Sequence, residues 1–284
     1  MPDPADLVPP LAPGGSPLRG GSSVAGGSSL RGGEPVPGDP GAPGAPGDPP
    51  VAPSGLSLPA RLCLLAWGAD GSGRAEAAVH RLVRAGALTE LAQRGLLVDD
   101  DGIATPVDLD ARSGDPVLDG LLDLVRESLP RRWRTWVTSR PRYTFVQLRE
   151  QLAAEGHLRV GRRRVLGVFP ATDHALRSVT VAEGLRARAR QVLAGPSPAA
   201  EIGERDAALA VLAAAAGLCT TAPPDRADRA DRAGRGRRVG ELIERSGAGS
   251  PALCGVVREI RTTLIAAADA DAAAAEARSP ADGR

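Results

Sequence analysis

Apolar positions recur at helical spacing through most of the chain after Gly55. In the segment 74–95, for example, Ala78, Leu82 and Val83 fall on one helical face, and Gly86 predicts a break into two helices. The run ERDAALAVLAAAAGLCT (204–220) is almost wholly apolar in its middle, which is typical of a central, buried helix. The same spacing predicts further helices at 113–129, 146–156, 179–195, 239–247 and 252–270.

Two short segments predict β-hairpins instead. LLVDDDGIATPV (96–107) and HLRVGRRRVLGVF (157–169) each read as strand, turn, strand, and each follows a helix that ends at a glycine. The first turn is acidic, whereas the second is basic, with Arg162, Arg163 and Arg164 at its turn. These elements predict a mainly α fold: a single globular helical domain over 56–270, with central buried helices and two small β-hairpins.

Both ends of the chain differ from this domain. The first 55 residues are mostly Pro, Gly, Ala and Ser, a composition that cannot bury enough apolar surface to offset the entropy of ordering. We therefore expect disordered tails at 1–55 and 271–284. The start lacks the pattern of a secretory signal, and the sequence has no run of about 18 apolar residues, so any contact with lipid is expected to be peripheral.

Positive charge is concentrated in the middle of the sequence. Every one of the 35 basic residues is arginine, a composition that indicates a GC-rich, bacterial coding sequence. Between Arg126 and Arg190, 15 arginines stand against five acidic residues, a local excess of +10 in a chain of net charge +1. This distribution predicts one positively charged face and an anionic partner. The guanidinium group suits phosphate, because it offers several planar donors.

The sequence does not support catalysis, a metal or a cofactor. Its acidic triplet 99–101 lacks the ligand spacing of a calcium loop, and no glycine-rich stretch has the strand and helix that frame a phosphate-binding loop. The histidines have no catalytic context: His80, His157 and His174. The cysteines are far apart in apolar helical patterns, which predicts buried structural thiols in a reducing, cytoplasmic compartment: Cys63, Cys219 and Cys254.

Two other classes of partner remain open at this point. A helix followed by a two-stranded wing with arginines at its tip is typical of winged-helix DNA-binding domains. Against this, the helix VQLREQLAAEG (146–156) carries two acids and one arginine, and an aromatic content of 2% argues against stacking on single strands. An adaptor that uses the basic face for an acidic protein is the third class.

An ordered series of segments runs from Leu56 to Ala270: LPARLCLLAW, LVRAGALTELAQRGLL, SGDPVLDGLLDLVRE, REQLAAEGHL, RRRVLGVFPATDHAL, RDAALAVLAAAAGL and RVGELIE. In this order the segments resemble the Golgi phosphoprotein 3 family, which comprises peripheral membrane proteins that bind phosphoinositides and has bacterial relatives, mainly in actinobacteria. The resemblance implies a mainly helical fold with a protruding hairpin. It also implies that the hairpin's apolar tip enters the bilayer beside a basic pocket for the phosphate of phosphatidylinositol 4-phosphate.

The resemblance also implies the residues of this pocket. Two family arginines fall on Arg84 and Arg142, a third falls on Phe145, and the family's tryptophan falls on Ala75. The neighbouring arginines that could replace the third are Arg140 and Arg149. Because half of the pocket is missing by this match, general binding of anionic lipid is favoured over selectivity for the 4-phosphate.

The hairpin implied by the resemblance carries the segment Arg162, Arg163, Arg164, Val165 and Leu166. Its apolar run either enters lipid or packs on the core of the domain, and both alternatives stay open. We therefore expect a cytoplasmic protein on the inner face of the cell membrane, with phosphatidylinositol or its 4-phosphate as partner. Homo-oligomers are compatible with the sequence, whereas no nucleic acid is expected.

Overall fold

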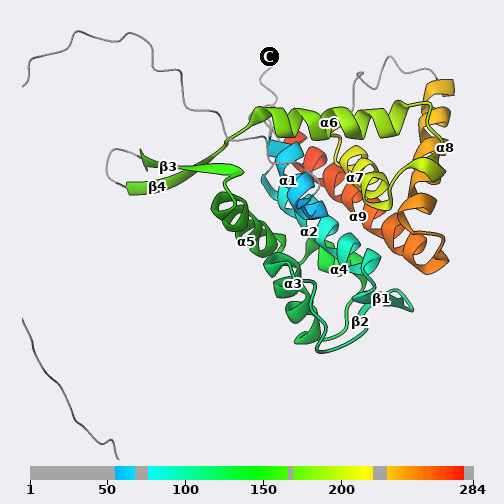
Figure 1. Cartoon of the computed structure of the whole chain (residues 1–284), viewed down its shortest axis with the longest axis horizontal. Coiled ribbons are helices and arrows are strands. Elements are labelled where there is room, and N and C mark those ends of the chain that lie inside the picture. Colours follow the sequence, from blue (N-terminus) through cyan, green and yellow to red (C-terminus); the bar gives the residue numbers. More distant parts are fainter. Residues whose placement is uncertain (1–54, 68–75, 166–168, 220–228, 278–284) are drawn as a thin grey trace, which may run out of the picture. The chain divides into compact units, whose positions relative to one another are not determined.

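Helices dominate the computed structural model, which describes residues 55–67, 76–165, 169–219 and 229–277. The predicted mainly α fold with two small antiparallel hairpins is confirmed (Figure 1). The helices are α1 (Leu58–Trp67), α2 (Glu76–Gln93), α3 (Pro116–Arg126), α4 (Trp133–Thr138), α5 (Pro141–Ala154), α6 (Val179–Ala194), α7 (Glu204–Ala215), α8 (Arg229–Ser246) and α9 (Pro251–Glu276). The strands are β1 (Leu97–Asp100), β2 (Ile103–Pro106), β3 (Leu158–Val165) and β4 (Phe169–Leu176).

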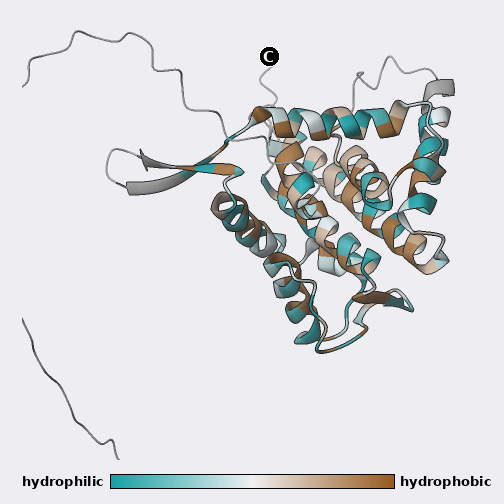
Figure 2. Ribbon diagram, viewed as in Figure 1, coloured by the Kyte–Doolittle hydropathy of each residue, from teal (hydrophilic) through white to brown (hydrophobic). Residues whose placement is uncertain are grey.

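The core lies around α2 and α7, which pack against each other and against α1 and α9. In α7 every residue from Ala207 to Ala213 is buried, which confirms the central helix predicted in 204–220. In Figure 2, α1 and the inner part of α7 are coloured mainly as hydrophobic, in line with their burial. Burial of this apolar surface supplies the main drive for folding, because each fully buried leucine contributes about 1.5–3 kcal/mol.

The predicted break at Gly86 is wrong, because α2 runs without interruption from Glu76 to Gln93. Gly86 serves the packing of α1 instead. A Cβ atom at this position would lie 2.6 Å from Leu62 Cδ1 and 3.2 Å from Pro59 Cα. The glycine therefore lets the backbones of α1 and α2 approach closely, and its helix-weakening effect of about 1 kcal/mol is offset by that contact.

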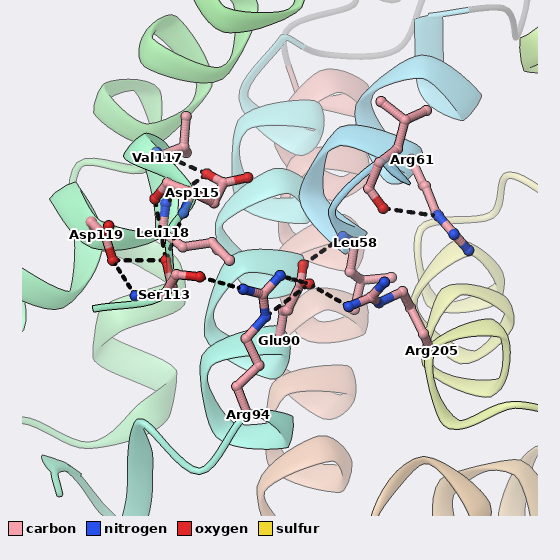
Figure 3. A network of polar contacts seen from close by, with 11 residues as sticks. Leu58, Arg61, Glu90, Arg94, Ser113, Asp115, Val117, Leu118, Asp119 and Arg205 are labelled. Atoms are coloured by element: carbon pink, nitrogen blue, oxygen red, sulfur yellow. Dashed lines mark hydrogen bonds and ion pairs between the residues drawn. The ribbon is translucent and has the colours of Figure 1, made fainter. Parts of the chain in front are cut away.

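A buried carboxylate joins three helices near the C-terminal end of α2 (Figure 3). The Oε2 atom of Glu90 accepts the backbone N–H of Leu58 at 2.6 Å, at the start of α1. Its Oε1 atom accepts from Arg94 Nη2 at 2.5 Å and from Arg205 Nη2, on α7, at 3.0 Å. Only 1% of the Glu90 side chain is exposed. This network fixes the start of α1 against α2, and so positions the rest of α1.

The acidic hairpin matches its prediction. Strands β1 and β2 pair from Leu97 opposite Pro106 to Asp100 opposite Ile103. The turn residues Asp101 and Gly102 both have positive φ, 50° and 81°, as a two-residue Asp-Gly turn requires.

The basic hairpin differs from its prediction, because the three arginines are not at a turn. Strand β3 continues through Arg162, Arg163 and Arg164, which pair with Thr172, Ala171 and Pro170 on β4. Gly161 lies within the strand, opposite Asp173. The connection between the strands is the segment 166–168, and it lies outside the described residues, as does the predicted membrane residue Leu166.

The ends of the predicted domain also need one correction. Helix α9 continues to Glu276, so the first residues of the predicted tail at 271–284 are helical. A helix continues here because the segment 271–276 consists of Ala, Asp and Glu, and alanine has the best intrinsic helix propensity. Residues 1–54 of the predicted N-terminal tail and residues 278–284 lie outside the described part of the chain.

Candidate functional site

Arg84, on α2, is a fully buried cation with unused hydrogen-bond donors. Its Nη2 atom donates to the backbone oxygen of Arg140 at 3.0 Å. Within the described residues, Nε and Nη1 have no hydrogen-bond partner. Burial lowers the pKa of Arg84 to about 10, so the guanidinium is still charged at pH 7. A buried charge without an acidic partner is costly, and such residues are concentrated at functional sites.

The start of α5 is strained where it meets Arg84. Arg140, the residue before the first turn, has a left-handed backbone with φ 46° and ψ 47°. Its carbonyl oxygen accepts both the Arg84 guanidinium and the N–H of Tyr143, the latter at 3.1 Å. The left-handed region is unfavourable for a residue with a side chain, and more so before a proline such as Pro141. Strain of this kind is often kept at binding sites. The Arg140 and Arg142 side chains are exposed.

Phe145, one turn further along α5, is the centre of a cluster of rings. Its ring lies 4.4 Å from that of His80 and 6.3 Å from that of Trp67, with Trp67 nearly parallel. The guanidinium carbon of Arg149 lies 5.8 Å from the centre of the Phe145 ring, within cation–π range. The Nε atom of Arg149 is buried and has no hydrogen-bond partner among the described residues. The cluster therefore holds a second arginine, on the ring of Phe145.

Two histidines flank this cluster. His80 is buried, and its pKa is lowered chiefly by burial, with Glu76 opposing and Arg142 reinforcing the shift. His174, on β4, lies edge-on to Trp67 at 6.5 Å. Its pKa is also lowered, first by burial and then by the positive charge of Arg149. Both imidazoles are therefore mainly neutral at pH 7.

The thiols are not reactive groups of this site. Burial raises the pKa of Cys63, on α1, to about 12, which keeps it protonated. Cys254 is also buried, as predicted, whereas Cys219 is half-buried. Within the described residues, no group of three or more His, Cys, Asp and Glu side chains is placed to hold a metal ion.

Comparison with known proteins gives one match. No curated protein matches the chain. Residues 58–276, well over half of its length, match the family model of Golgi phosphoprotein 3 (GPP34). The chain belongs to the Golgi phosphoprotein 3 family. This family is associated with phosphoinositide binding and is not a known enzyme family. In the described part of the chain, no helix is both long and apolar enough to cross a bilayer.

The four arginines that the resemblance to Golgi phosphoprotein 3 proteins suggested lie at two neighbouring elements, α2 and α5. Arg84 contacts Arg140 directly, and Arg142 and Arg149 both act electrostatically on His80. Phe145, at a family arginine position, is 7% exposed and carries no charge into the cluster. Ala75, at the family tryptophan position, lies outside the described residues. The structure therefore brings Arg84 to the start of α5 and brings Arg142 and Arg149 near His80.

The two hairpins of this Golgi phosphoprotein 3 family member relate to the helices in different ways. Asp99 of the acidic hairpin accepts a hydrogen bond from Trp133 Nε1 at 2.7 Å, and Ile103 forms a β-bridge with Arg132. The basic hairpin packs on α5 through β3 at its root and then runs away from the helices (Figure 1). The Asp99 carboxylate of the acidic hairpin is therefore bound within the domain by Trp133.

Sequence reasoning missed His80, His174 and Trp67. The spacing of His80 and Arg84, four residues apart, would have placed them on one face of α2. Trp67 gave no local signal, because it is the last residue of α1 and meets Phe145 only through the tertiary packing of α1 on α2 and α5.

Proposed function

We propose that this protein is a peripheral membrane protein that binds the phosphate groups of anionic phospholipids at the cytoplasmic face of the cell membrane. The observation that supports this most is Arg84, a fully buried guanidinium with two donor atoms that have no partner among the described residues. A phosphate oxygen is the natural acceptor for those donors, since charge-assisted hydrogen bonds are the strong ones. The lipids that suit the site are phosphatidylinositol and its 4-phosphate.

The surrounding arginines extend the same chemistry. Arg140 and Arg142 are exposed at the start of α5, where the Arg140 backbone meets Arg84, and Arg149 lies on the ring of Phe145. Arg84 would hold one phosphate oxygen at depth, while Arg142 and Arg149 attract the rest of the headgroup. Because Phe145 brings no charge, the site has fewer deep cations than selectivity for a phosphomonoester needs. Anionic headgroups in general are therefore its expected ligands.

The basic hairpin supplies the second part of the proposal. Attraction to an anionic leaflet contributes about 1 kcal/mol per arginine near the surface, so Arg162, Arg163 and Arg164 would contribute a few kcal/mol. Val165 and Leu166 would each add up to about 1.5–3 kcal/mol if they became fully buried in lipid. Either term alone gives weak attachment, and the two together give stable peripheral binding.

Vesicle sedimentation tests the proposal. Vesicles of phosphatidylcholine alone are compared with vesicles that also contain phosphatidylglycerol, phosphatidylinositol or its 4-phosphate. We expect binding to the anionic vesicles that falls as salt is raised. The double variant Arg84→Ala, Arg142→Ala should lose at least about tenfold in affinity, because it removes one deep and one outer contact to phosphate.

A matched control removes two arginines elsewhere. Arg112 and Arg258 are 58% and 57% exposed and pair with Asp123 and Glu244. The variant Arg112→Ala, Arg258→Ala has the same net charge as the test variant and should bind within about twofold of the wild type. Equal binding to neutral and anionic vesicles, or to neither, would refute the proposal. Retardation of duplex DNA that is lost on replacing Arg162, Arg163 and Arg164 would favour the winged-helix alternative instead.

A further inference from the structure

Two of the chain's three histidines contact the same ring cluster. His80 lies one helical turn before Arg84 on α2, with its ring 4.4 Å from Phe145. His174 lies on β4, at the root of the basic hairpin, with its ring 6.5 Å from Trp67. The Trp67–Phe145 stack joins the two. The cluster therefore connects the buried arginine to the hairpin through two groups that can gain a proton near neutral pH.

The charged groups around each histidine are few among the described residues. His80 faces Glu76 on its own helix, with Nε2 3.3 Å from Oε1, and faces Arg142 and Arg149 on α5. α1 presents Trp67 and Cys63 to this region, and neither is charged.

The surroundings of His174 follow the same pattern. It faces Asp173 on its own strand, and Arg149 and Glu150 on α5. Arg149 thus acts on both histidines, so a single change in the charge around Arg149 reaches both imidazoles.

We propose that His80 and His174 are proton-dependent members of the anion site, which take up protons when a phosphate headgroup binds and so make binding stronger as pH falls. This inference rests on the proposed function. In the free protein, burial and the neighbouring arginines oppose the charged imidazolium. A phosphate among the arginines would offset their repulsion and attract the imidazolium directly, so it would raise the pKa of both histidines.

The direction of the effect follows from linkage. Because the bound protein would hold more protons than the free protein, affinity rises as pH falls through the range between the two sets of pKa values. The free-state values lie below the usual 6.5, so both histidines are neutral and affinity is constant above about pH 8. Each histidine that is protonated should increase affinity about fivefold, the gain expected for one added basic residue near an anionic surface.

The test uses full-length protein and vesicles of phosphatidylglycerol mixed with phosphatidylcholine. The phosphodiester of phosphatidylglycerol does not titrate between about pH 5.5 and pH 8, so a change in binding reports on the protein. We expect wild-type affinity to rise at least about tenfold over this range. The variant His80→Gln, His174→Gln should bind with little dependence on pH. His157→Gln is the matched control, because its side chain pairs with Glu155 at 3.9 Å, and it should behave as the wild type.

Calorimetry in two buffers of different ionisation enthalpy gives a second readout, since it counts the protons taken up on binding. Wild type should take up protons near pH 6, and the double variant should take up almost none. If the double variant does not fold, His174→Gln alone, at a half-buried strand position, should lose part of the uptake. Anionic binding that is independent of pH, or pH dependence that survives in the double variant, would overturn this inference but leave the anion site intact. Absence of anion-dependent binding at every pH would overturn both.

Discussion

The two buried charges of α2 have opposite surroundings, although they lie six residues apart. Glu90 accepts hydrogen bonds from an N–H of α1 and from two arginines, so its carboxylate is neutralised. Arg84 donates to a single carbonyl oxygen, and two of its donor atoms are unused within the described residues. Glu90 therefore shows that a charge buried in α2 can be given hydrogen-bond partners. The difference indicates that Glu90 holds the fold together and that Arg84 is kept for a ligand.

The largest expected effect comes from removing the neutralised charge. Glu90→Ala leaves the N–H of Leu58 and the guanidinium groups of Arg94 and Arg205 without their acceptor. We expect the free energy of unfolding to fall by about 3–5 kcal/mol, as for other broken buried pairs. Urea denaturation followed by circular dichroism measures it. Glu244→Ala, which removes a 63% exposed partner of Arg258, should cost less than about 1 kcal/mol. Equal costs for the two variants would show that the Glu90 network is not structural.

The opposite effect on stability is expected when the charge of Arg84 is removed. Arg84→Met removes a charge that is buried without an acidic partner and keeps most of the apolar volume. The free energy of unfolding should therefore stay the same or rise by about 1 kcal/mol. Binding to phosphatidylinositol vesicles should fall at least about tenfold in the same variant. A loss of stability as large as that of Glu90→Ala would assign Arg84 a structural role and end the contrast between the two residues.

A smaller effect concerns the pH dependence of stability and involves His80, one turn before Arg84. The pKa of His80 is lower in the folded protein than in the unfolded chain, so the unfolded chain binds the proton first as pH falls. Stability in the absence of lipid is therefore constant above about pH 7.5 and should decrease as pH falls below 6.5.

The control for this decrease is His80→Gln, in which thermal denaturation should vary less with pH over the same range. Anionic vesicles should oppose the decrease in the wild type, because a bound phosphate favours the protonated histidine. A wild-type stability that rises on acidification would contradict the sign of the shift.

Much of the fold was predictable from local pattern, since the helices and both hairpins were found from periodicity and turn residues. The exceptions depended on a second element. Gly86 reads as a helix breaker until Leu62 and Pro59 are placed against it. Gly161 and the arginines that follow read as a turn, because the register that extends β3 is set by pairing with β4 rather than by β3 alone.

The candidate site was also predictable only in part. Arg84 and Arg142 were suggested by the resemblance, and in the structure Arg84 meets the start of α5, the helix that carries Arg142. The hub at Phe145 was not, because it forms where the end of α1, the first half of α2 and the start of α5 meet. No pattern along one helix carries that information. From the sequence, Phe145 is a position where the family arginine is missing. In the structure, its ring is the surface on which Arg149 and Trp67 lie.

The close contact at Gly86 has a mechanical consequence for this arrangement. Helix α1 touches α2 at Pro59 and Leu62 and ends at Trp67, about 7.5 Å beyond Leu62 along its axis at 1.5 Å per residue. The contact at Gly86 therefore sets how closely α1 lies on α2, and α1 carries Trp67 to Phe145. A methyl group at Gly86 would push α1 away from α2 at this point, so a glycine two residues from Arg84 influences the ring cluster without touching it.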